Sequence, residues 1–317
     1  MTTPATSNFT LQDDQPPVTS HGPVNLVLLL LPSAMSSTSP RDLMSYNDYL
    51  TMLSVFNCVL KPVIIAVGVP TNVISCVVFW RQGLRSRMNV CLLALVLVDL
   101  CFLLVAMAFM VCFFLELIDP VRFDGLYISL QGHIVGVNHG FRIASGCITM
   151  VIAVERCLCV LFPLKAASLI SSRGMAVIMV GIVCLTQVGY FSMPATYVVR
   201  WTNSTPRYVL TKSSDLFMQN QKFFTVLEKI IMMNVVPITT FIITCLTTGL
   251  TMVKLTAAIT WRGKMSSTSE QGQDRHTAVS KMLVVVCGVY ILSSIPCVMV
   301  YVSTLVTEEF TLRDRGR

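Results

Sequence analysis

The stretch FRIASGCITMVIAVERCLCVLFPLK, residues 141–165, decides the fold class that this sequence predicts. It is long and apolar enough to cross a bilayer as one helix, because such a span needs about 20 residues. A charged pair, Glu155-Arg156, stands near its end, and Pro163 and Leu164 begin seven residues after Arg156. Charged side chains are costly within a membrane, so the pair predicts a functional site at one membrane face.

The composition places the rest of the chain in a membrane as well. Of its 317 residues, 54% are hydrophobic and only 12% are charged, whereas a soluble domain has about 25% charged residues. Residues 1–52 are rich in Ser, Thr and Pro and predict a disordered tail. Six apolar runs predict membrane spans at about 53–80, 88–117, 131–160, 175–199, 223–253 and 277–306, followed by a short terminal segment over 307–317.

The positions of Lys and Arg predict the orientation. These residues are more frequent after the first, third and fifth spans, as is typical of cytoplasmic loops. The N-terminus is then extracellular and Arg156 faces the cytosol, and the predicted glycosylation sites Asn8 and Asn203 both lie outside. The net charge of +7 is assigned to these loops, since no nucleic-acid-binding motif is present. The twelve cysteines lack zinc-site spacing, so no structural metal is predicted.

The charged pair in the third span resembles a known signature. Glu155-Arg156 with Pro163-Leu164 is similar to the E/D-R-Y/C…P-L pattern of rhodopsin-like G-protein-coupled receptors. The resemblance covers roughly residues 53–306 and implies an all-α integral membrane protein, a seven-helix receptor bundle of which six spans are visible. It also implies that Glu155 restrains Arg156 at rest and that both residues take part in activating a heterotrimeric G protein. Because no seventh span is visible, we expect the chain to be truncated.

Further matches lie in the first three spans. Asn72, Asp99 and Ser145 match the residues that line the sodium pocket of the family, and a carboxylate with neutral oxygens suits a hard cation. A sodium ion is therefore the one candidate cofactor. The alternative is that Asp99 is a hydrogen-bonded contact between helices. Pro237 and Pro296 are predicted to kink the fifth and sixth spans.

The outer halves of the third and fifth spans match positions where relatives contact ligands. The candidate ligand-binding residues are Asn138, His139, Arg142, Lys229 and Met233. Arg142 and Lys229 would bring two cations into one cavity, which would favour an anionic or amino-acid-like cue. Asn138 stands where amine receptors use Asp, which argues against a biogenic amine. The alternative is that the two cations pair with Glu228 or Glu116 and never touch a ligand.

The sequence therefore predicts a receptor of the plasma membrane and not an enzyme. The pattern around Arg142 to Thr149 is most like the gastropod chemosensory receptors, so we expect a chemosensory receptor that binds an extracellular small molecule and activates a G protein. One alternative is a neuropeptide receptor. An alternative of another class is a membrane transporter or channel, in which Asp99 and Arg142 would line the pathway.

Overall fold

The elements of the fold belong to one of two units of the chain. The units are Met1–Leu53 and Ser54–Arg317, and all of the helices and strands named below lie in the second. The computed structural model describes residues 51–52, 54–162, 171–191, 193–194, 197–202, 207–212, 218–263, 285, 287–300 and 302. Most of the predicted tail, the terminal segment, Pro163, Leu164 and the sequons at Asn8 and Asn203 lie outside these residues.

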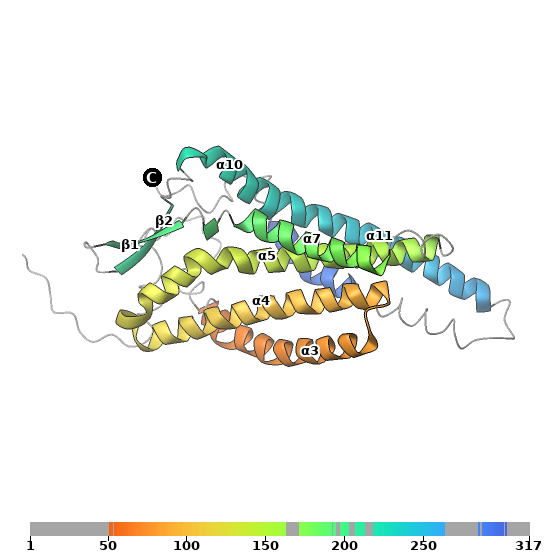
Figure 1. Ribbon diagram of the computed structural model, residues 1–317, viewed down its shortest axis with the longest axis horizontal. Coiled ribbons are helices and arrows are strands. Elements are labelled where there is room, and N and C mark those ends of the chain that lie inside the picture. The colour runs from red at the N-terminus through yellow and green to blue at the C-terminus, as the bar shows by residue number, and fades with distance from the viewer. Residues whose placement is uncertain are drawn as a thin grey trace, which may run out of the picture. The chain divides into compact units, whose positions relative to one another are not determined.

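The described part of the second unit is a helical bundle with one β-hairpin (Figure 1). Its helical elements are η1 (Phe56–Leu60), α3 (Lys61–Gln82), α4 (Arg87–Ile118), α5 (Pro120–Leu161), α7 (Ser172–Tyr190), α10 (Gln221–Thr225), η2 (Val226–Val235) and α11 (Val236–Gly263). A shorter apolar helix covers Cys287–Val300. Five of the described helices are long and apolar enough to cross a membrane. The predicted helical membrane bundle is therefore confirmed.

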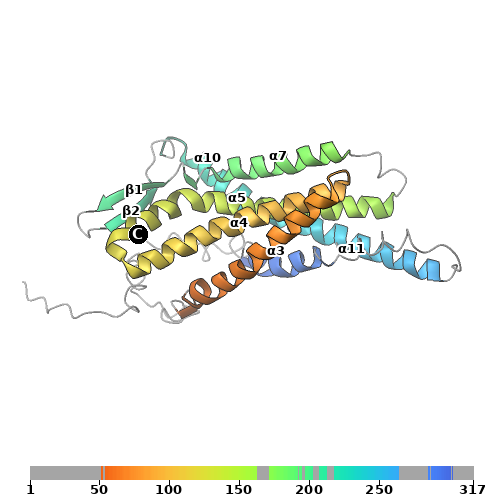
Figure 2. The ribbon, with the colours of Figure 1, turned by 60° about the horizontal axis from the view of Figure 1, so that its bottom comes forward.

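Helix α5 is the central element, packed against α4, α7 and α11 (Figure 1). Half of its most apolar stretch is buried inside the protein, against 6% for the first spanning helix, Phe56–Gln82. Figure 2 shows α3 crossing α4 at the side of the bundle. The exposed side chains of α3 include Val67 and Ile74. A helix that is apolar on all sides suits a lipid environment, so these side chains need no protein partner.

The best-packed core lies where α4, α5 and α7 meet. Cys91 of α4, Ala144, Ile148 and Ile152 of α5 and Met175 of α7 have no exposed surface. Lipid tails are as apolar as these side chains, so close packing, and not removal from water, stabilises such contacts in a membrane. The core therefore holds the C-terminal half of α5 in a fixed position between α4 and α7.

Glycine allows α5 and α7 to approach closely. A Cβ atom added at Gly136 would stand 2.7 Å from the backbone oxygen of Tyr190, and one at Gly140 would stand 2.7 Å from Oε1 of Gln187. Small residues at helix interfaces permit this approach of backbones. Because the helices lie this close, the Nε2 of Gln187 on α7 donates a hydrogen bond of 3.3 Å to the backbone oxygen of Val137 on α5.

Three predicted boundaries differ from the structure. The fifth span is predicted to end at residue 253, but α11 continues to Gly263. Helix α5 begins at Pro120 and not near residue 131, because Asp119 caps it by accepting a hydrogen bond from the backbone nitrogen of Arg122 and proline suits the first helical turn. The predicted fourth span ran to residue 199, but α7 ends at Tyr190. Residues from Tyr197 onward pair instead as the antiparallel strands β1 (Tyr197–Thr202) and β2 (Arg207–Lys212), which satisfies their backbone groups without a helix.

The fifth span combines two helical forms. The π-helix η2 leads directly into α11, whose second residue is the buried Pro237. Proline has no N–H to donate to the preceding turn, so the chain adopts a wider turn just before it. The hydroxyl of Tyr190 on α7 donates a hydrogen bond of 3.1 Å to the backbone oxygen of Met232 in η2. This contact ties the irregular segment to the bundle.

Candidate functional site

The charged pair predicted from the sequence lies at the end of α5, where Glu155 is buried. The Nε of Arg156 donates a hydrogen bond of 2.6 Å to Oε2 of Glu155, and its Nη2 forms an ion pair with the same carboxylate. A buried carboxylate needs such partners because loss of its hydration is costly. Glu155 and Arg156 are thus in direct contact in this structure, and the predicted restraint of Arg156 in signalling stays a prediction.

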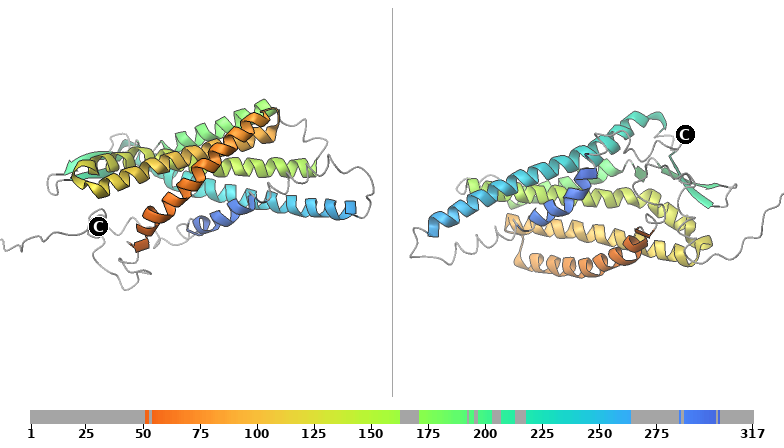
Figure 3. Two further views of the ribbon diagram at one scale, coloured as in Figure 1. Left: turned by 90° about the horizontal axis from the view of Figure 1, so that it is seen from below. Right: turned by 180° about the vertical axis from the view of Figure 1, so that it is seen from behind.

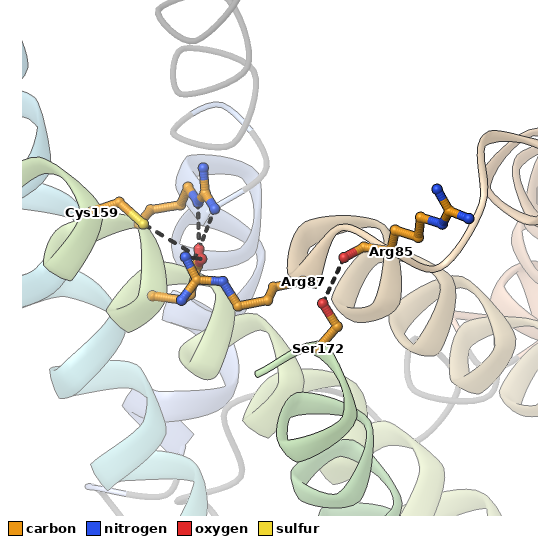
Figure 4. Close-up of polar contacts among 6 residues, drawn as sticks. Arg85, Arg87, Cys159 and Ser172 are labelled. Carbon is orange, nitrogen blue, oxygen red and sulfur yellow. Dashed lines mark hydrogen bonds and ion pairs between the residues drawn. The ribbon is translucent and has the colours of Figure 1, made fainter. Parts of the chain in front are cut away.

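Glu155 has further partners that the sequence did not single out. Arg87, the first residue of α4, places its Nη2 3.9 Å from Oε1 of Glu155. The Sγ of Cys159, one turn further along α5, donates to the same oxygen at 3.5 Å. Figure 4 shows these side chains converging on one carboxylate. Sequence spacing does not pair Arg87 with Glu155, because the two residues lie on different helices.

The turn that precedes Arg87 is fixed by polar contacts. Gly83 adopts φ 84°, a conformation that glycine takes without strain, and its oxygen accepts a hydrogen bond of 3.0 Å from Nδ2 of Asn89. The backbone oxygen of Arg85 accepts a hydrogen bond of 2.6 Å from the hydroxyl of Ser172, at the start of α7 (Figure 4). The turn between α3 and α4 therefore holds Arg87 beside Glu155.

A second polar site is a cavity of about 290 Å³ beside the middle of α5, on the N-terminal side of the charged pair. Its wall is formed by α4, α5, α11 and the Cys287–Val300 helix, the last of which lies beside α11 in both views of Figure 3. The lining residues are Asp99, Phe102, Arg142, Ile143, Ser145, Gly146, Pro237, Thr240, Tyr290, Ser293, Ser294, Cys297 and Val298. Three residues that the sequence assigned to ligand or sodium sites, Asp99, Arg142 and Ser145, thus share one cavity.

The geometry of α5 explains why these side chains meet. Arg142, Ser145 and Thr149 follow each other at spacings of three and four residues, which places them on one helix face. The side chain of Ser145 interacts with that of Asp99 on α4, and both line the cavity. Thr149, one turn deeper, is buried, and its hydroxyl donates to the backbone oxygen of Ser145 at 2.9 Å.

Four of the predicted site residues do not line the cavity. The Nδ2 of Asn72 donates to the backbone oxygen of Gly68 in its own helix at 2.9 Å. The ring of His139 stacks on Tyr190 with centroids 5.8 Å apart. Met233 packs against the cluster around Tyr190 and Met232. Asn138 is also absent from the lining, and its buried Oδ1 accepts no hydrogen bond.

Two further predicted residues, Lys229 and Pro296, belong to η2 and to the Cys287–Val300 helix. The side chain of Lys229, in η2, lies outside the described residues, so its predicted place beside Arg142 stays a prediction. Pro296 lies in the Cys287–Val300 helix and is exposed. Glu228 and Glu116 are both buried, and neither lines the cavity.

The helix over Cys287–Val300 contributes residues that sequence reasoning missed. Tyr290 lines the cavity beside Gly146, where an added Cβ would stand 2.9 Å from the tyrosine hydroxyl oxygen. Ser293 and Ser294 bring two further hydroxyl groups to the same wall. The signal was the spacing of four residues between Tyr290 and Ser294, which places both on one helix face.

The cavity offers oxygen ligands suited to a hard cation. The carboxylate of Asp99 and the hydroxyls of Ser145 and Ser294 are the kinds of groups that such an ion prefers. Asn72 does not line this cavity, and the predicted sodium pocket stays a prediction. Among the described residues, no group of three or more His, Cys, Asp or Glu is placed to hold a metal ion.

Comparison with known proteins gives one result over most of the chain. The family model described as "7 transmembrane receptor (rhodopsin family)" matches residues 71–315. This match contains the cavity and all of α4, α5, α7 and α11. It also contains Glu155 with its partners Arg87, Arg156 and Cys159, which we call the Glu155 cluster. No curated protein matches the chain.

Proposed function

Because the chain belongs to the rhodopsin family of seven-transmembrane receptors, we propose that it is a chemosensory receptor for a small extracellular molecule. Membership makes it a multi-pass protein of the plasma membrane and a signalling receptor, not an enzyme. Its partners are a heterotrimeric G protein, an extracellular ligand and the lipid bilayer. In our proposal the N-terminus is extracellular and the sequons at Asn8 and Asn203 carry glycans.

The observation that carries this proposal is that one helix, α5, holds both polar sites. Arg142 lines the cavity, and Arg156 forms the ion pair with Glu155. They are fourteen residues apart, which is about 21 Å along a helix. A ligand that binds better when α5 has moved relative to α4 or α11 would shift the population toward that arrangement. The Glu155 cluster would then be disturbed and Arg156 released toward the G protein.

The size of the cavity favours a small molecule over a neuropeptide. Its volume of about 290 Å³ is near the lower end of ligand pockets, which span about 300–1,000 Å³. Arg142 gives the wall a permanent positive charge. Together these features support an anionic or amino-acid-like cue. A sodium ion at Asp99 and Ser145 remains a proposal for a state without this cue.

A test of the proposal measures nucleotide exchange on purified heterotrimeric G protein with the receptor in vesicles. We expect small carboxylates or amino acids to accelerate exchange by the native chain. Arg156→Ala should abolish that response without weakening binding of the cue, because Arg156 does not line the cavity. Stimulation by peptides alone would favour the neuropeptide alternative.

Solute flux is the control for a protein of another class. The same vesicles are loaded with buffer and exposed to the small acids and amino acids of the exchange assay. A receptor should show exchange without net uptake. Uptake that depends on Asp99 and Arg142, with no nucleotide exchange, would contradict the chemosensory proposal and support a transport pathway.

A further inference from the structure

We propose that the cavity selects a small zwitterion, a molecule with both a carboxylate and an ammonium group. Arg142 binds the carboxylate and Asp99 binds the ammonium group. This inference rests on the proposed function, since it names the class of cue for the same site. Among the residues that the structure describes, Asp99 is the charged residue that lines the cavity together with Arg142.

The charges of the wall provide the first argument. Among the described residues, the lining contains one guanidinium, from Arg142, and one carboxylate, from Asp99. A simple anion would bring its charge into a small space that also holds the Asp99 carboxylate, and a simple cation would meet Arg142 in the same way. Like charges brought together are costly, whereas a ligand with both signs meets an opposite charge at each end. Arg142 can also bind a carboxylate through two parallel hydrogen bonds.

The arrangement along α5 provides the second argument. Arg142 lies three residues before Ser145, a rise of about 4.5 Å in a helix. Ser145 and Asp99 interact and line the same cavity, so the carboxylate of Asp99 lies near the depth of Ser145. The backbones of Arg142 and Ser145 thus differ in depth by nearly one helical turn. A short amino acid with a few carbon atoms between its charges suits this spacing.

Volume and polarity provide the third argument. The cavity of about 290 Å³ corresponds to roughly ten water molecules at about 30 Å³ each, so it has room for a small solute. Apolar surface for contact with a short carbon chain comes from Phe102, Ile143 and Pro237, which line the same cavity. The remaining hydrogen-bonding groups of the wall are neutral hydroxyls from Thr240, Tyr290, Ser293 and Ser294.

The test uses three probes of matched length with the purified chain in lipid nanodiscs. The zwitterion is 4-aminobutanoate, the acid is butanoate and the amine is 1-aminobutane, and isothermal titration calorimetry gives each Kd. We expect the zwitterion to bind tighter than both others. Arg142→Gln and Asp99→Asn should each weaken it by about tenfold or more, because each removes a charge-assisted contact.

The single-charge probes make the two variants controls for each other. Arg142→Gln should weaken butanoate and spare 1-aminobutane, and Asp99→Asn should do the reverse. Binding of the spared probe also shows that the variant is folded. The matched control is Arg122→Gln, which makes the same change at an exposed position of the same helix outside the cavity. It should leave all three affinities unchanged.

Several outcomes would overturn the inference. They are a zwitterion that binds no tighter than the acid or the amine, an Asp99→Asn variant that binds the zwitterion normally, or no binding of any probe to the native chain. If neither variant binds anything, the comparison of the three probes on the native chain decides the question alone.

Calorimetry involves no G protein, so the two proposals fail separately. Selective zwitterion binding without nucleotide exchange would contradict the proposed function and leave the site standing. Nucleotide exchange driven by a small molecule of a single charge would contradict the zwitterion site and leave the proposed function standing.

Discussion

Arg87 at the start of α4 and Glu155 near the end of α5 lie 3.9 Å apart, measured from Nη2 to Oε1. Glu155 thereby meets two arginines, because Arg156 binds its other oxygen. The side chain of Glu155 is 7% exposed and that of Arg87 is 21% exposed. The contact joins two helices, whereas the pair Glu155-Arg156 lies within one. Arg87 therefore links the ion pair of Glu155 and Arg156 to the position of α4.

Removing the carboxylate should raise signalling without ligand. In Glu155→Gln the ion pair with Arg156 is lost, so we expect nucleotide exchange without ligand to rise several-fold. The measurement is exchange on G protein in vesicles, with receptor amounts matched by immunoblot. Unchanged basal exchange in a folded variant would show that Glu155 does not restrain Arg156.

Removing Arg87 should have a smaller effect of the same sign. Arg87→Gln leaves the bonds between Glu155 and Arg156 in place, and a partly exposed ion pair contributes only about 0–1 kcal/mol. We expect basal exchange to rise by about twofold, less than in Glu155→Gln. The control is Arg85→Gln. Arg85 accepts the hydrogen bond from Ser172 through its backbone oxygen, which this substitution leaves in place (Figure 4). Equal increases in both arginine variants would point to loop charge and not to this ion pair.

The contact between Gly146 and Tyr290 predicts a rescue by a second substitution. In Gly146→Ala the new methyl group would stand 2.9 Å from the tyrosine hydroxyl, and such overpacking costs about 1–3 kcal/mol. Tyr290→Phe removes the clashing oxygen, so the double variant should recover most of the thermal stability in detergent. The control is Gly249→Ala in α11, where no atom lies within 4 Å of the added Cβ. A loss in Gly146→Ala that the double variant retains in full would show that the clash is not the cause.

Two glycines at helix contacts, Gly136 on α5 and Gly189 on α7, should differ in their tolerance of alanine. At Gly136 the new methyl group meets the backbone oxygen of Tyr190 at 2.7 Å, and backbone cannot yield locally. At Gly189 it meets the terminal methyl of Met232 at 2.5 Å, which is the end of a flexible side chain. We expect Gly136→Ala to lower the Tm by several degrees more than Gly189→Ala, measured by dye-monitored unfolding.

The matched control for both glycines is Gly181→Ala on α7, where nothing lies within 4 Å of the added Cβ. Alanine is a better helix former than glycine by about 1 kcal/mol, so this variant should be as stable as the native chain or more so. If all three variants lost stability equally, close approach of the helices would not explain the glycines.

The tyrosine hydroxyl on α7 should stabilise the irregular start of the fifth span. Tyr190→Phe removes the hydrogen bond to the backbone oxygen of Met232 and leaves that oxygen without this donor. Loss of a buried hydrogen bond costs about 1–3 kcal/mol. We expect faster hydrogen exchange in η2 than in the native chain, with α3 unchanged as the internal reference. Identical exchange in η2 would show that the bond does not hold the segment.

Some parts of the site could be predicted from local sequence because they depend on one helix. Glu155 and Arg156 are neighbours, and Arg142 and Ser145 share a face by helical spacing alone. The partner of Glu155 on α4 and the tyrosine beside Gly146 could not be found in this way. Each of them depends on how far one helix is shifted along another, which is set by packing over many residues.

The order of the residues by itself determined that this chain is a bundle of membrane helices, because long apolar runs with few charges can satisfy their backbone groups in lipid only as helices. It also placed the charged pair at the end of α5. Only the tertiary structure decided that Asp99 and Arg142 share one cavity while Asn72 and His139 lie outside its wall. The reason is that helical periodicity fixes which residues share a face, whereas the rotation and offset of each helix follow from its packing against the others.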